Sequence, residues 1–276
     1  MHPMMTIALK EFRDALRNRW IVSATLLLAG LAFALSFLGS APAGGMLGVK
    51  PLAVVVVSLS SLTVFLLPLI ALLLAYDALV GEAERGTLLL LFTYPITRNQ
   101  LLLGKFLGHT GVILFATVIG YGVAGLAMGW RGDGADAQSG WAFVFLIGSS
   151  VVLGAIFIAL AYLISAWVRE RGTAAGLAMG VWLFFVVLYD LGLLGLLAAT
   201  SGQLSERLFS WMLLANPADL FRLVNLGTFE NVRVFSGLAG LSQQVTWPSE
   251  ILLASLLAWL VVPLALAMWR FRRVEP

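Results

Sequence analysis

The chain has 276 residues, of which 61% are apolar and 11% are charged, with a net charge of +3. Soluble globular domains contain roughly 45–50% apolar and about 25% charged residues, and a chain of this size cannot hide so large an apolar excess from water. The basic residues form no patch with interleaved aromatic residues, so the charge does not indicate nucleic-acid binding. The chain contains no cysteine, which excludes disulfides, thiolate nucleophiles and cysteine-based metal sites. The composition predicts an all-α integral membrane protein.

Six apolar stretches are long enough to cross a bilayer, for which a helix needs about 20 apolar residues. Only the fifth has a charged residue in its interior, Asp190. The first is too long to be the apolar core of a cleaved signal peptide. Within a single membrane domain that covers residues 1–276, we expect transmembrane helices over residues 20–39, 52–79, 106–129, 141–167, 173–199 and 250–269.

Lysine and arginine residues are concentrated on one side of these expected spans. If both termini are cytoplasmic, the inner segments carry 12 of the 17 basic residues, although the outer segments are together longer. Cytoplasmic loops favour Lys and Arg, so we predict that both termini lie inside the cell. The inner basic residues are Lys10, Arg13, Arg17, Arg19, Arg85, Arg98, Lys105, Arg169, Arg171, Arg270, Arg272 and Arg273.

Residues 4–19 have the pattern of an amphipathic helix. Leu9, Phe12, Leu16 and Trp20 recur at spacings of three and four, which puts them on one helical face. Charged residues occupy the other faces. We expect this helix to lie along the inner membrane surface, either as a simple anchor for the first span or also as a docking surface for a cytoplasmic partner.

The segment between the second and third spans, residues 80–105, is unusual for a cytoplasmic loop. A charged stretch at 82–85 precedes a Gly-Thr pair, and an apolar run at 88–92 follows. We predict a short helix with one apolar face, ended by Pro95. The residues alone fit two interpretations: a re-entrant or interfacial connector, or a lever that inserts into a groove on another protein.

Residues 200–248 form the longest expected outer segment. Leu208 and Trp211 mark an amphipathic stretch, and the sequence N-P-A-D at 216–219 is typical of a helix start, with Asn as the N-cap and Pro at the first helical position. We expect this second helix to continue to Gly227. A loop of this length is usually functional, so the segment is either an external docking or gating platform or a structural cap over the bundle.

The residues that catalysis would need are sparse. The chain has no G-x-x-x-x-G-K-[ST] phosphate loop and no G-x-S-x-G nucleophile motif. Its two histidines are His2 and His109, and we interpret His109 as a packing residue. The methionines are scattered singly, as is ordinary for core filler, and do not suggest a copper path. We therefore expect no catalytic residue, no metal site and no cofactor bound by this chain.

Asp190 lies inside the fifth expected span, directly after Tyr189. A charge within the hydrocarbon is costly, so this side chain should face the bundle interior or a wet cavity. Three interpretations remain open: a role in a transport pathway, a helix–helix hydrogen bond, and a neutral, protonated acid.

The arrangement resembles the ABC-2 type permeases, which are the membrane subunits of a class of ABC transporters. In that family the cytoplasmic coupling element reads E-x-E-x-G-T-L, then P-[IV]-[ST]-R-x-x-[LIV], then G-K. This sequence departs only in having Arg85 between the second Glu and the Gly, which the family tolerates. The matching residues are Glu82, Glu84, Gly86, Thr87, Leu88, Pro95, Ile96, Thr97, Arg98, Leu102, Gly104 and Lys105.

Within this family the chain is most similar to the permeases of nitrous oxide reductase maturation, in its length, its long outer loop and the N-P-A-D-L-F-R element from Asn216 to Arg222. The resemblance implies a homodimer in the bacterial inner membrane, bound by a dimer of a separate cytoplasmic ATPase that binds ATP and Mg²⁺. It also implies a periplasmic solenoid partner of the NosD-like type and a role in assembling the copper–sulfur centre of the reductase.

The residue patterns and the resemblance together give three groups of candidate residues. For contact with the ATPase we expect Glu82, Glu84, Arg85, Gly86, Thr87, Leu88, Leu91, Pro95 and Arg98. For a periplasmic partner or gate we expect Leu208, Trp211, Asn216, Pro217, Asp219 and Arg222, and for a possible pathway Tyr189 and Asp190. The alternative functions are an intramembrane enzyme, which would need a nucleophile–base pair, and a membrane scaffold or channel without an energy source.

Overall fold

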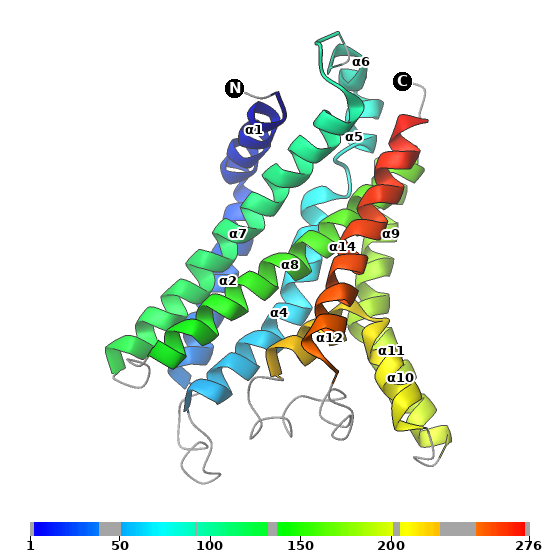
Figure 1. The fold of residues 1–276 in the computed structure, drawn as a ribbon. Helices are drawn as coiled ribbons and strands as arrows, with labels where there is room; N and C mark the ends of the chain where they lie inside the picture. Colours follow the sequence, from blue (N-terminus) through cyan, green and yellow to red (C-terminus); the bar gives the residue numbers. More distant parts are fainter. Residues whose placement is uncertain are drawn as a thin grey trace.

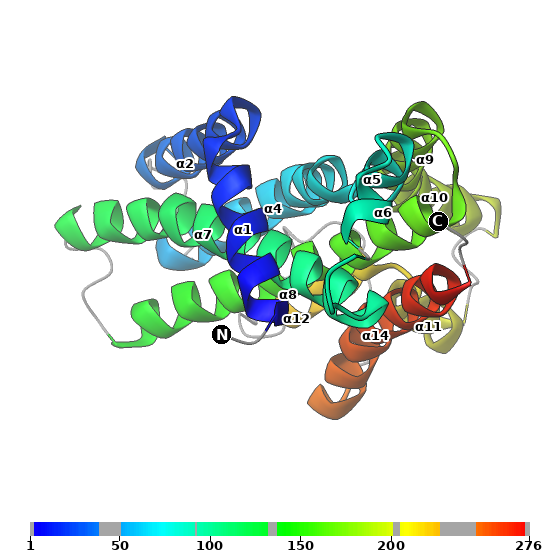
Figure 2. The same ribbon diagram turned by 90° about the horizontal axis from the view of Figure 1, so that it is seen from above.

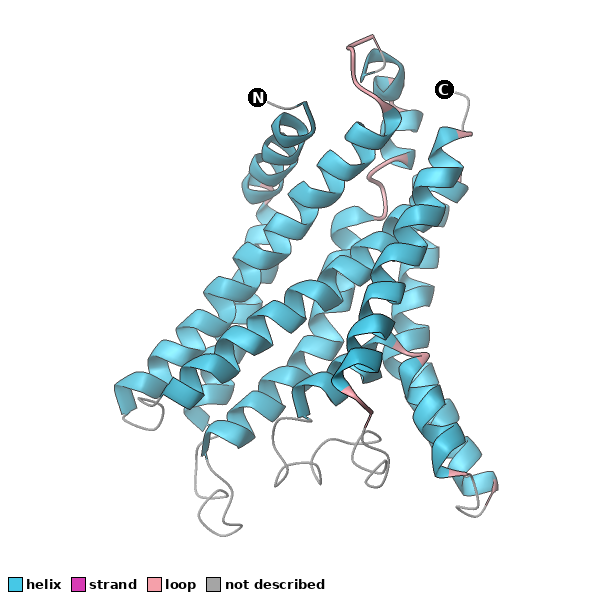
Figure 3. Ribbon diagram, in the orientation of Figure 1, coloured by secondary structure: helices cyan, strands magenta, loops and turns pink. Residues whose placement is uncertain are grey.

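The computed structural model describes residues 3–38, 51–91, 93–131, 137–200, 205–226 and 247–273. These residues form helices and loops, with no strand among them (Figure 3). The helices are α1 (Pro3–Arg17), α2 (Arg19–Leu38), α4 (Pro51–Ala75), α5 (Val80–Glu84), α6 (Thr87–Leu91), α7 (Arg98–Arg131), α8 (Ala137–Trp167), α9 (Arg171–Leu183), the π-helix η1 (Phe184–Leu188), α10 (Tyr189–Ala199), α11 (Glu206–Leu214), α12 (Pro217–Leu226) and α14 (Ser249–Arg272).

Five helical segments in the described part of the chain are long and apolar enough to cross a membrane. A sixth is obtained if α1 and α2, which meet at an angle of 75°, are counted as one bent span. Both chain termini lie at the same end of the bundle, together with α5 and α6 (Figure 1). The helices therefore agree with a multi-pass membrane protein, while the side on which the termini lie stays a prediction.

Helix α1 packs closely across α7 because α7 presents glycines at the crossing (Figure 2). A Cβ atom on Gly104 would lie 2.8 Å from the backbone oxygen of Met4, and one on Gly108 would lie 2.7 Å from that of Ala8. Any larger residue at these two positions would push α1 away. The G-K pair at 104–105 thus has a packing role, in addition to the charge that it carries.

Helix α8 runs through the centre of the bundle, in contact with α4, α7, α12 and α14. Its side chains Phe157 and Tyr162 are fully buried. Burial of this kind follows from a helix that is apolar on all sides. The core around α8 is what holds the shorter elements α5, α6 and α12 at defined positions.

Helix α7 begins earlier than the third expected span. The hydroxyl of Thr97 accepts a hydrogen bond from the backbone N–H of Gln100, and the Gln100 side chain accepts one from the N–H of Thr97. This reciprocal capping box starts the helix at Arg98. Residues 98–105, expected in the cytoplasmic segment, are therefore the first turns of a long helix.

The outer segment 200–248 does not lie wholly beyond the end of the bundle. Helix α11 turns back along α10, where the hydroxyl of Tyr189 donates to the carbonyl of Met212 at 2.6 Å. Asn216 then donates to the carbonyl of Phe185 at 2.9 Å. Phe185 lies near the middle of the 29-residue span Arg171–Ala199, about 20 Å from each end. The chain between the fifth and sixth spans thus re-enters the bundle, and residues 201–204 and 227–246 of this segment lie outside the described residues.

Candidate functional site

Two short helices, α5 and α6, form the loop between α4 and α7 at the end of the bundle that carries both termini (Figure 1). The hydroxyl of Ser165, on α8, accepts hydrogen bonds from the backbone N–H groups of Leu79 and Val80, both at 3.0 Å. This contact satisfies donors that the first turn of a helix leaves open. Gly86, with φ of +69°, makes the turn between α5 and α6. A side chain is disfavoured in this left-handed conformation.

The apolar run at 88–91 is divided between the core and the surface. Leu88 is buried and Leu91 is half-buried against the core. Leu89 and Leu90 are 56% and 64% exposed, and Tyr94 is 64% exposed. The outward face of α6 and the residues after it is therefore apolar, at an end of the molecule where the short helices are not covered by other described elements.

The charged residues of this loop hold neighbouring spans. The Glu84 carboxylate accepts a hydrogen bond of 2.7 Å from the backbone N–H of Arg171, the first residue of α9. A carboxylate at the N-terminus of a helix is also stabilised by the positive end of the helix dipole. The Arg171 side chain forms an ion pair of 2.6 Å with Asp77, which precedes α5. The start of α9 is thus attached at two points, to α5 through Glu84 and to the residues before α5 through Asp77.

Arg98 makes a corresponding attachment to the last helix. Its guanidinium donates to the backbone carbonyls of Phe271 and Arg272, at 2.8 and 3.3 Å. These carbonyls lie at the C-terminal end of α14, where a cation is favoured by the helix dipole. Pro95 is exposed in the turn that leads to Arg98, and the Thr87 hydroxyl donates to the carbonyl of Glu82 at 3.2 Å.

Glu82 faces inward and is buried. Its Oε1 lies 2.7 Å from Nζ of Lys105, which also lies 2.9 Å from Oε1 of Glu11. One buried ammonium on α7 therefore joins carboxylates from α1 and α5. We call Glu11, Glu82 and Lys105 the Lys105 cluster. His109, one turn further along α7, contacts Tyr162 at 3.0 Å, in agreement with its interpretation as a packing residue.

The Glu11 carboxyl stays ionised in this cluster. Burial by itself would raise its pKa, but the neighbouring Lys105 ammonium lowers it, as does Lys10, and the net effect is a pKa below its usual value. An ionised Glu11 keeps the attraction to Lys105 at neutral pH. The contact between α1 and α7 is therefore fixed by charge as well as by close glycine packing.

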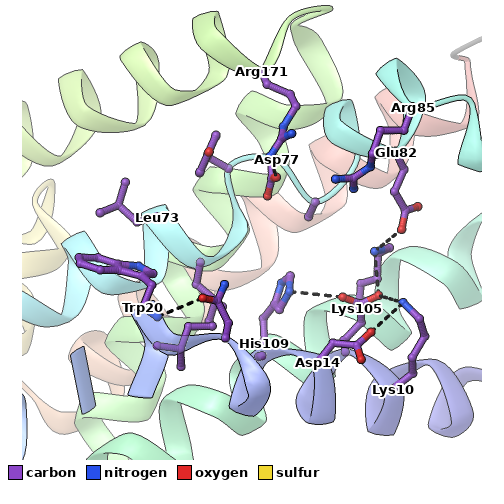
Figure 4. Close-up of a pocket in the computed structure, with 17 residues that line it drawn as sticks. Lys10, Asp14, Trp20, Leu73, Asp77, Glu82, Arg85, Lys105, His109 and Arg171 are labelled. Atoms are coloured by element: carbon purple, nitrogen blue, oxygen red, sulfur yellow. Dashed lines mark hydrogen bonds and ion pairs between the residues drawn. The ribbon is translucent and has the colours of Figure 1, made fainter. Parts of the chain in front are cut away.

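A polar cavity of about 580 Å³ lies between α1, α5, α7 and the start of α9. Figure 4 shows Arg85 and Arg171 on one wall and α1, with Lys10 and Asp14, on the opposite wall. Trp20 lies at one end of the cavity. The cavity thus brings together charged side chains that are far apart in the sequence, at the end of the bundle where the termini lie.

A second buried group of charges lies deep in the bundle. Arg222, on α12, lies 2.7 Å from Asp190 and 2.7 Å from Asp219. Asp219 also accepts a hydrogen bond of 2.9 Å from Asn216. The other oxygen of Asp190, Oδ1, is buried and accepts no hydrogen bond from the described residues. We call Asp190, Asn216, Asp219 and Arg222 the Arg222 cluster.

The backbone at this depth is irregular. The π-helix η1 immediately precedes Tyr189, and its Phe185 carbonyl receives the Asn216 amide. Inserted π-turns often occur at functional positions. The N-cap predicted at Asn216 is confirmed, because its side chain accepts the N–H of Ala218 and α12 begins at Pro217. Helix α12 is thus fixed to the middle of the fifth span.

Of the residues expected to contact a periplasmic partner, some are buried and others are exposed. Asn216 and Asp219 are fully buried and Arg222 is largely buried, so their contacts are within the chain. Leu208 and Trp211, on α11, are 52% and 50% exposed. The structure therefore joins the expected pathway residues Tyr189 and Asp190 to Asn216, Asp219 and Arg222 in one internal network. Of the residues expected for a periplasmic partner, Leu208 and Trp211 on α11 are the exposed ones.

The sequence interpretation missed Glu11, Asp77 and Arg171 as partners of the loop residues. Glu11 and Lys105 are 94 positions apart, as are Asp77 and Arg171, so no local pattern reveals either pair. One signal was present: the glycines at 104 and 108 share a helical face, and small residues at this spacing let another helix approach. Lys105, which belongs to the motif, follows the first of them.

Comparison with known proteins agrees with this geometry. Residues 5–275 match the family model described as ABC-2 family transporter protein. A protein of Stutzerimonas stutzeri described as "Probable ABC transporter permease protein NosY" is 47% identical over 274 residues, covering 99% of each chain. A protein of Pseudomonas aeruginosa with the same description matches with the same identity and coverage. The resemblance based on residues 82–105 is therefore confirmed, and this chain belongs to the ABC-2 family of transporter permeases.

Proposed function

We propose that this chain is the membrane-spanning subunit of an ABC transporter in the bacterial inner membrane, and that it passes on conformational changes driven by a separate cytoplasmic ATPase dimer. The observation that carries the proposal is the exposed apolar face formed by Leu89, Leu90 and Tyr94. This face belongs to the loop between α4 and α7, which is hydrogen-bonded to α8 and α9 and, through Arg98 at its end, to α14. An apolar helix face of this kind fits a groove on a partner protein.

The attachments of the loop give the proposed movement a direction. Glu84 and Asp77 hold the start of α9, and Arg98 holds the end of α14. A partner that displaces α6 would therefore pull on the fifth and sixth spans together. Rigid elements that move as bodies are the usual means of such transmission.

The fifth span leads to the Arg222 cluster. Asp190 and the Phe185 carbonyl on this span hold Arg222 and Asn216 of the re-entrant segment. Movement of α9 and α10 would shift α11 and α12, and with them the exposed Leu208 and Trp211. These two residues are the proposed contact for a periplasmic partner of the NosD-like solenoid type.

The relatives named NosY suggest the biological role. We propose that two copies of this chain act in nitrous oxide reductase maturation, in the assembly of its copper–sulfur centre. The chain itself would bind neither ATP nor Mg²⁺.

The ATPase contact is tested by co-purification of the tagged chain with its ATPase from the producing cells. The variant combines Leu89→Ser and Leu90→Ser, and the matched control is Leu257→Ser, an exposed leucine on α14. Loss of the apolar contact should reduce the recovered ATPase by at least about tenfold, while the control keeps it. Full recovery with the double variant in a monodisperse, membrane-inserted form would refute the assignment of α6.

The maturation role is tested in cells that lack this chain. The absorption spectrum of the purified reductase reports its copper–sulfur centre. We expect the wild-type chain and the Leu257→Ser control to restore the centre, and the double leucine variant to leave it unassembled. A complete centre in cells without the chain would contradict the proposed role.

A further inference from the structure

The cavity between α1, α5, α7 and α9 is lined by charges of both signs. It has a volume of about 580 Å³ and opens at the end of the bundle where the spans begin. Its charged walls and its apolar end come from different elements (Figure 4). A cavity with unpaired donors, an unpaired acceptor and an apolar end fits a ligand that itself carries a positive group, a negative group and an apolar part.

Two arginines, Arg85 at the end of α5 and Arg171 at the start of α9, lie on one wall of the cavity. Arg85 is exposed toward the cavity and forms no ion pair among the described residues. Arg171 uses one nitrogen for Asp77, and its Nε is buried without a hydrogen-bond partner in the described part of the chain. Two guanidinium groups with open donors on one wall are suited to the oxygens of a phosphate.

Acidic side chains line the cavity as well, and one of them, Glu82, lies on α5 beside Arg85 (Figure 4). Three carboxylates, from Glu11, Asp14 and Glu82, share two ammonium groups, from Lys10 and Lys105. The second oxygen of Glu82, Oε2, is buried and accepts no hydrogen bond from the described residues. A buried carboxylate oxygen without a donor is costly, and a primary ammonium would supply the missing donor.

The remaining end of the cavity is apolar. Trp20 and Ile21 at the start of α2, together with Leu73 and Leu74 near the end of α4, line it. The indole of Trp20 is half exposed, and tryptophan is enriched at the level of lipid head groups. These residues lie where two spans enter the expected membrane, so an acyl chain could leave the cavity past them into the bilayer.

We propose that this cavity binds the phosphoethanolamine group of a membrane phospholipid. The phosphate lies against Arg85 and Arg171, and the ammonium donates to Glu82 Oε2. A phosphatidylcholine head group has no N–H donor for Glu82, and a phosphatidylglycerol head group has no positive charge. Phosphatidylethanolamine is therefore preferred over both, and it connects α5 to α9 next to the ATPase-contacting loop.

The proposal is tested by native mass spectrometry of the full-length chain in detergent, without ATPase, so its failure is independent of the proposed function. The probes are dioleoyl phosphatidylethanolamine, phosphatidylcholine and phosphatidylglycerol, added separately at equal concentration. One molecule of the ethanolamine lipid should be retained about tenfold more strongly than either other lipid, which corresponds to one charge-assisted hydrogen bond. Equal retention of the three lipids, or of none, would overturn the proposal.

Variants locate the bound lipid. Arg85→Gln should reduce retention of the ethanolamine lipid about tenfold, and Glu82→Gln should remove its preference over phosphatidylcholine. Arg13→Gln is the matched control, because Arg13 is an exposed arginine on α1 that does not line the cavity. Unchanged retention in Arg85→Gln would place the lipid elsewhere. Because Arg85 is exposed, this variant remains informative even if Glu82→Gln fails to fold.

A soluble compound with the same head group distinguishes the source of the ligand. Glycerophosphoethanolamine carries the phosphate and the ammonium but no acyl chain. It should displace the lipid only at a large excess, because it lacks contacts with Trp20 and Leu73. Tight binding of the soluble compound without retention of the lipid would overturn the membrane source.

Discussion

Two buried clusters in this chain have the same composition of charges, one cation between two carboxylates, in different surroundings. Lys105 lies 2.9 and 2.7 Å from Glu11 and Glu82, and Arg222 lies 2.7 Å from both Asp190 and Asp219. The Lys105 cluster joins three separate elements beside a polar cavity. In the Arg222 cluster the arginine and Asp219 lie one turn apart on α12, deep in the bundle.

The two clusters differ in whether a ligand or a partner protein can reach them. The Lys105 cluster is open to a ligand and to the loop that we propose as the ATPase contact, so a change there alters how α1, α5 and α7 fit together. The Arg222 cluster has its own amide donor, Asn216, and ties a re-entrant helix to the fifth span. We infer that the first cluster receives a signal and that the second holds the element that the signal moves.

The largest effect should come from Lys105→Met, which keeps the length of the side chain and removes the charge. Glu82 would then be left buried without its cation and Glu11 would keep only the exposed Lys10, and we expect a loss of about 3–5 kcal/mol in the free energy of unfolding. The measurement is chemical denaturation in detergent micelles. Adding Glu82→Gln to this variant should recover part of the loss; no recovery would mean that Lys105 stabilises the fold by packing alone.

Arg222→Met should cost less, about 1–3 kcal/mol, because Asn216 still donates to Asp219 and the Asp190 side chain is partly exposed. The same denaturation experiment gives the value. The triple variant with Asp190→Asn and Asp219→Asn removes the unpaired charges and should approach wild-type stability. If Arg222→Met exceeds the cost of Lys105→Met, the ranking of the two clusters is wrong.

The sequence predicted the elements that depend on local pattern. Hydropathy placed the apolar spans, and the N-P-A-D pattern placed the start of α12 at Pro217. It did not predict that α11 turns back, because Leu208 and Trp211 give an amphipathic pattern whether the helix lies outside the bundle or beside α10. The depth of this segment depends on two hydrogen bonds with the fifth span, from Tyr189 to the carbonyl of Met212 and from Asn216 to the carbonyl of Phe185.

The candidate site shows the same limit. The motif residues Glu82 and Glu84 were recognised, but their partners were not, because Lys105 and the N–H of Arg171 approach them only in the folded chain. A carboxylate in a sequence motif can contact a partner protein, cap a helix or neutralise a buried lysine. The sequence gives no means of choosing among these three, and here the structure assigns Glu82 to the last and Glu84 to the second.

The pH dependence of stability separates Glu11 from the exposed acid next to it. Because the pKa of Glu11 in the fold lies below its ordinary value of 4.5, its contribution to stability is complete above pH 4.5 and is lost as the pH falls below that value. The slope in this acid range should be at most about 1.4 kcal/mol per pH unit. Glu11→Gln should reduce this slope, whereas Asp14→Asn, at a side chain that is 57% exposed, should not. Equal effects of the two variants would show that Glu11 is not set apart by its burial beside Lys105.

The smallest predicted effect concerns the turn that sets the register of α5 relative to α6. Gly86 has φ of +69°, so Gly86→Ala should cost about 1 kcal/mol in the free energy of unfolding, and Gly86→Asn less, because Asn tolerates this conformation better. Gly30→Ala is the control, since a Cβ at this helical position meets no atom within 4 Å. Because Gly86 lies between the carboxylates of α5 and the exposed face of α6, Gly86→Ala should weaken ATPase recovery more than its small cost in stability suggests. If ATPase recovery falls only in proportion to the free energy of unfolding, the turn stabilises the loop and does not set the direction in which α6 presents Leu89 and Leu90.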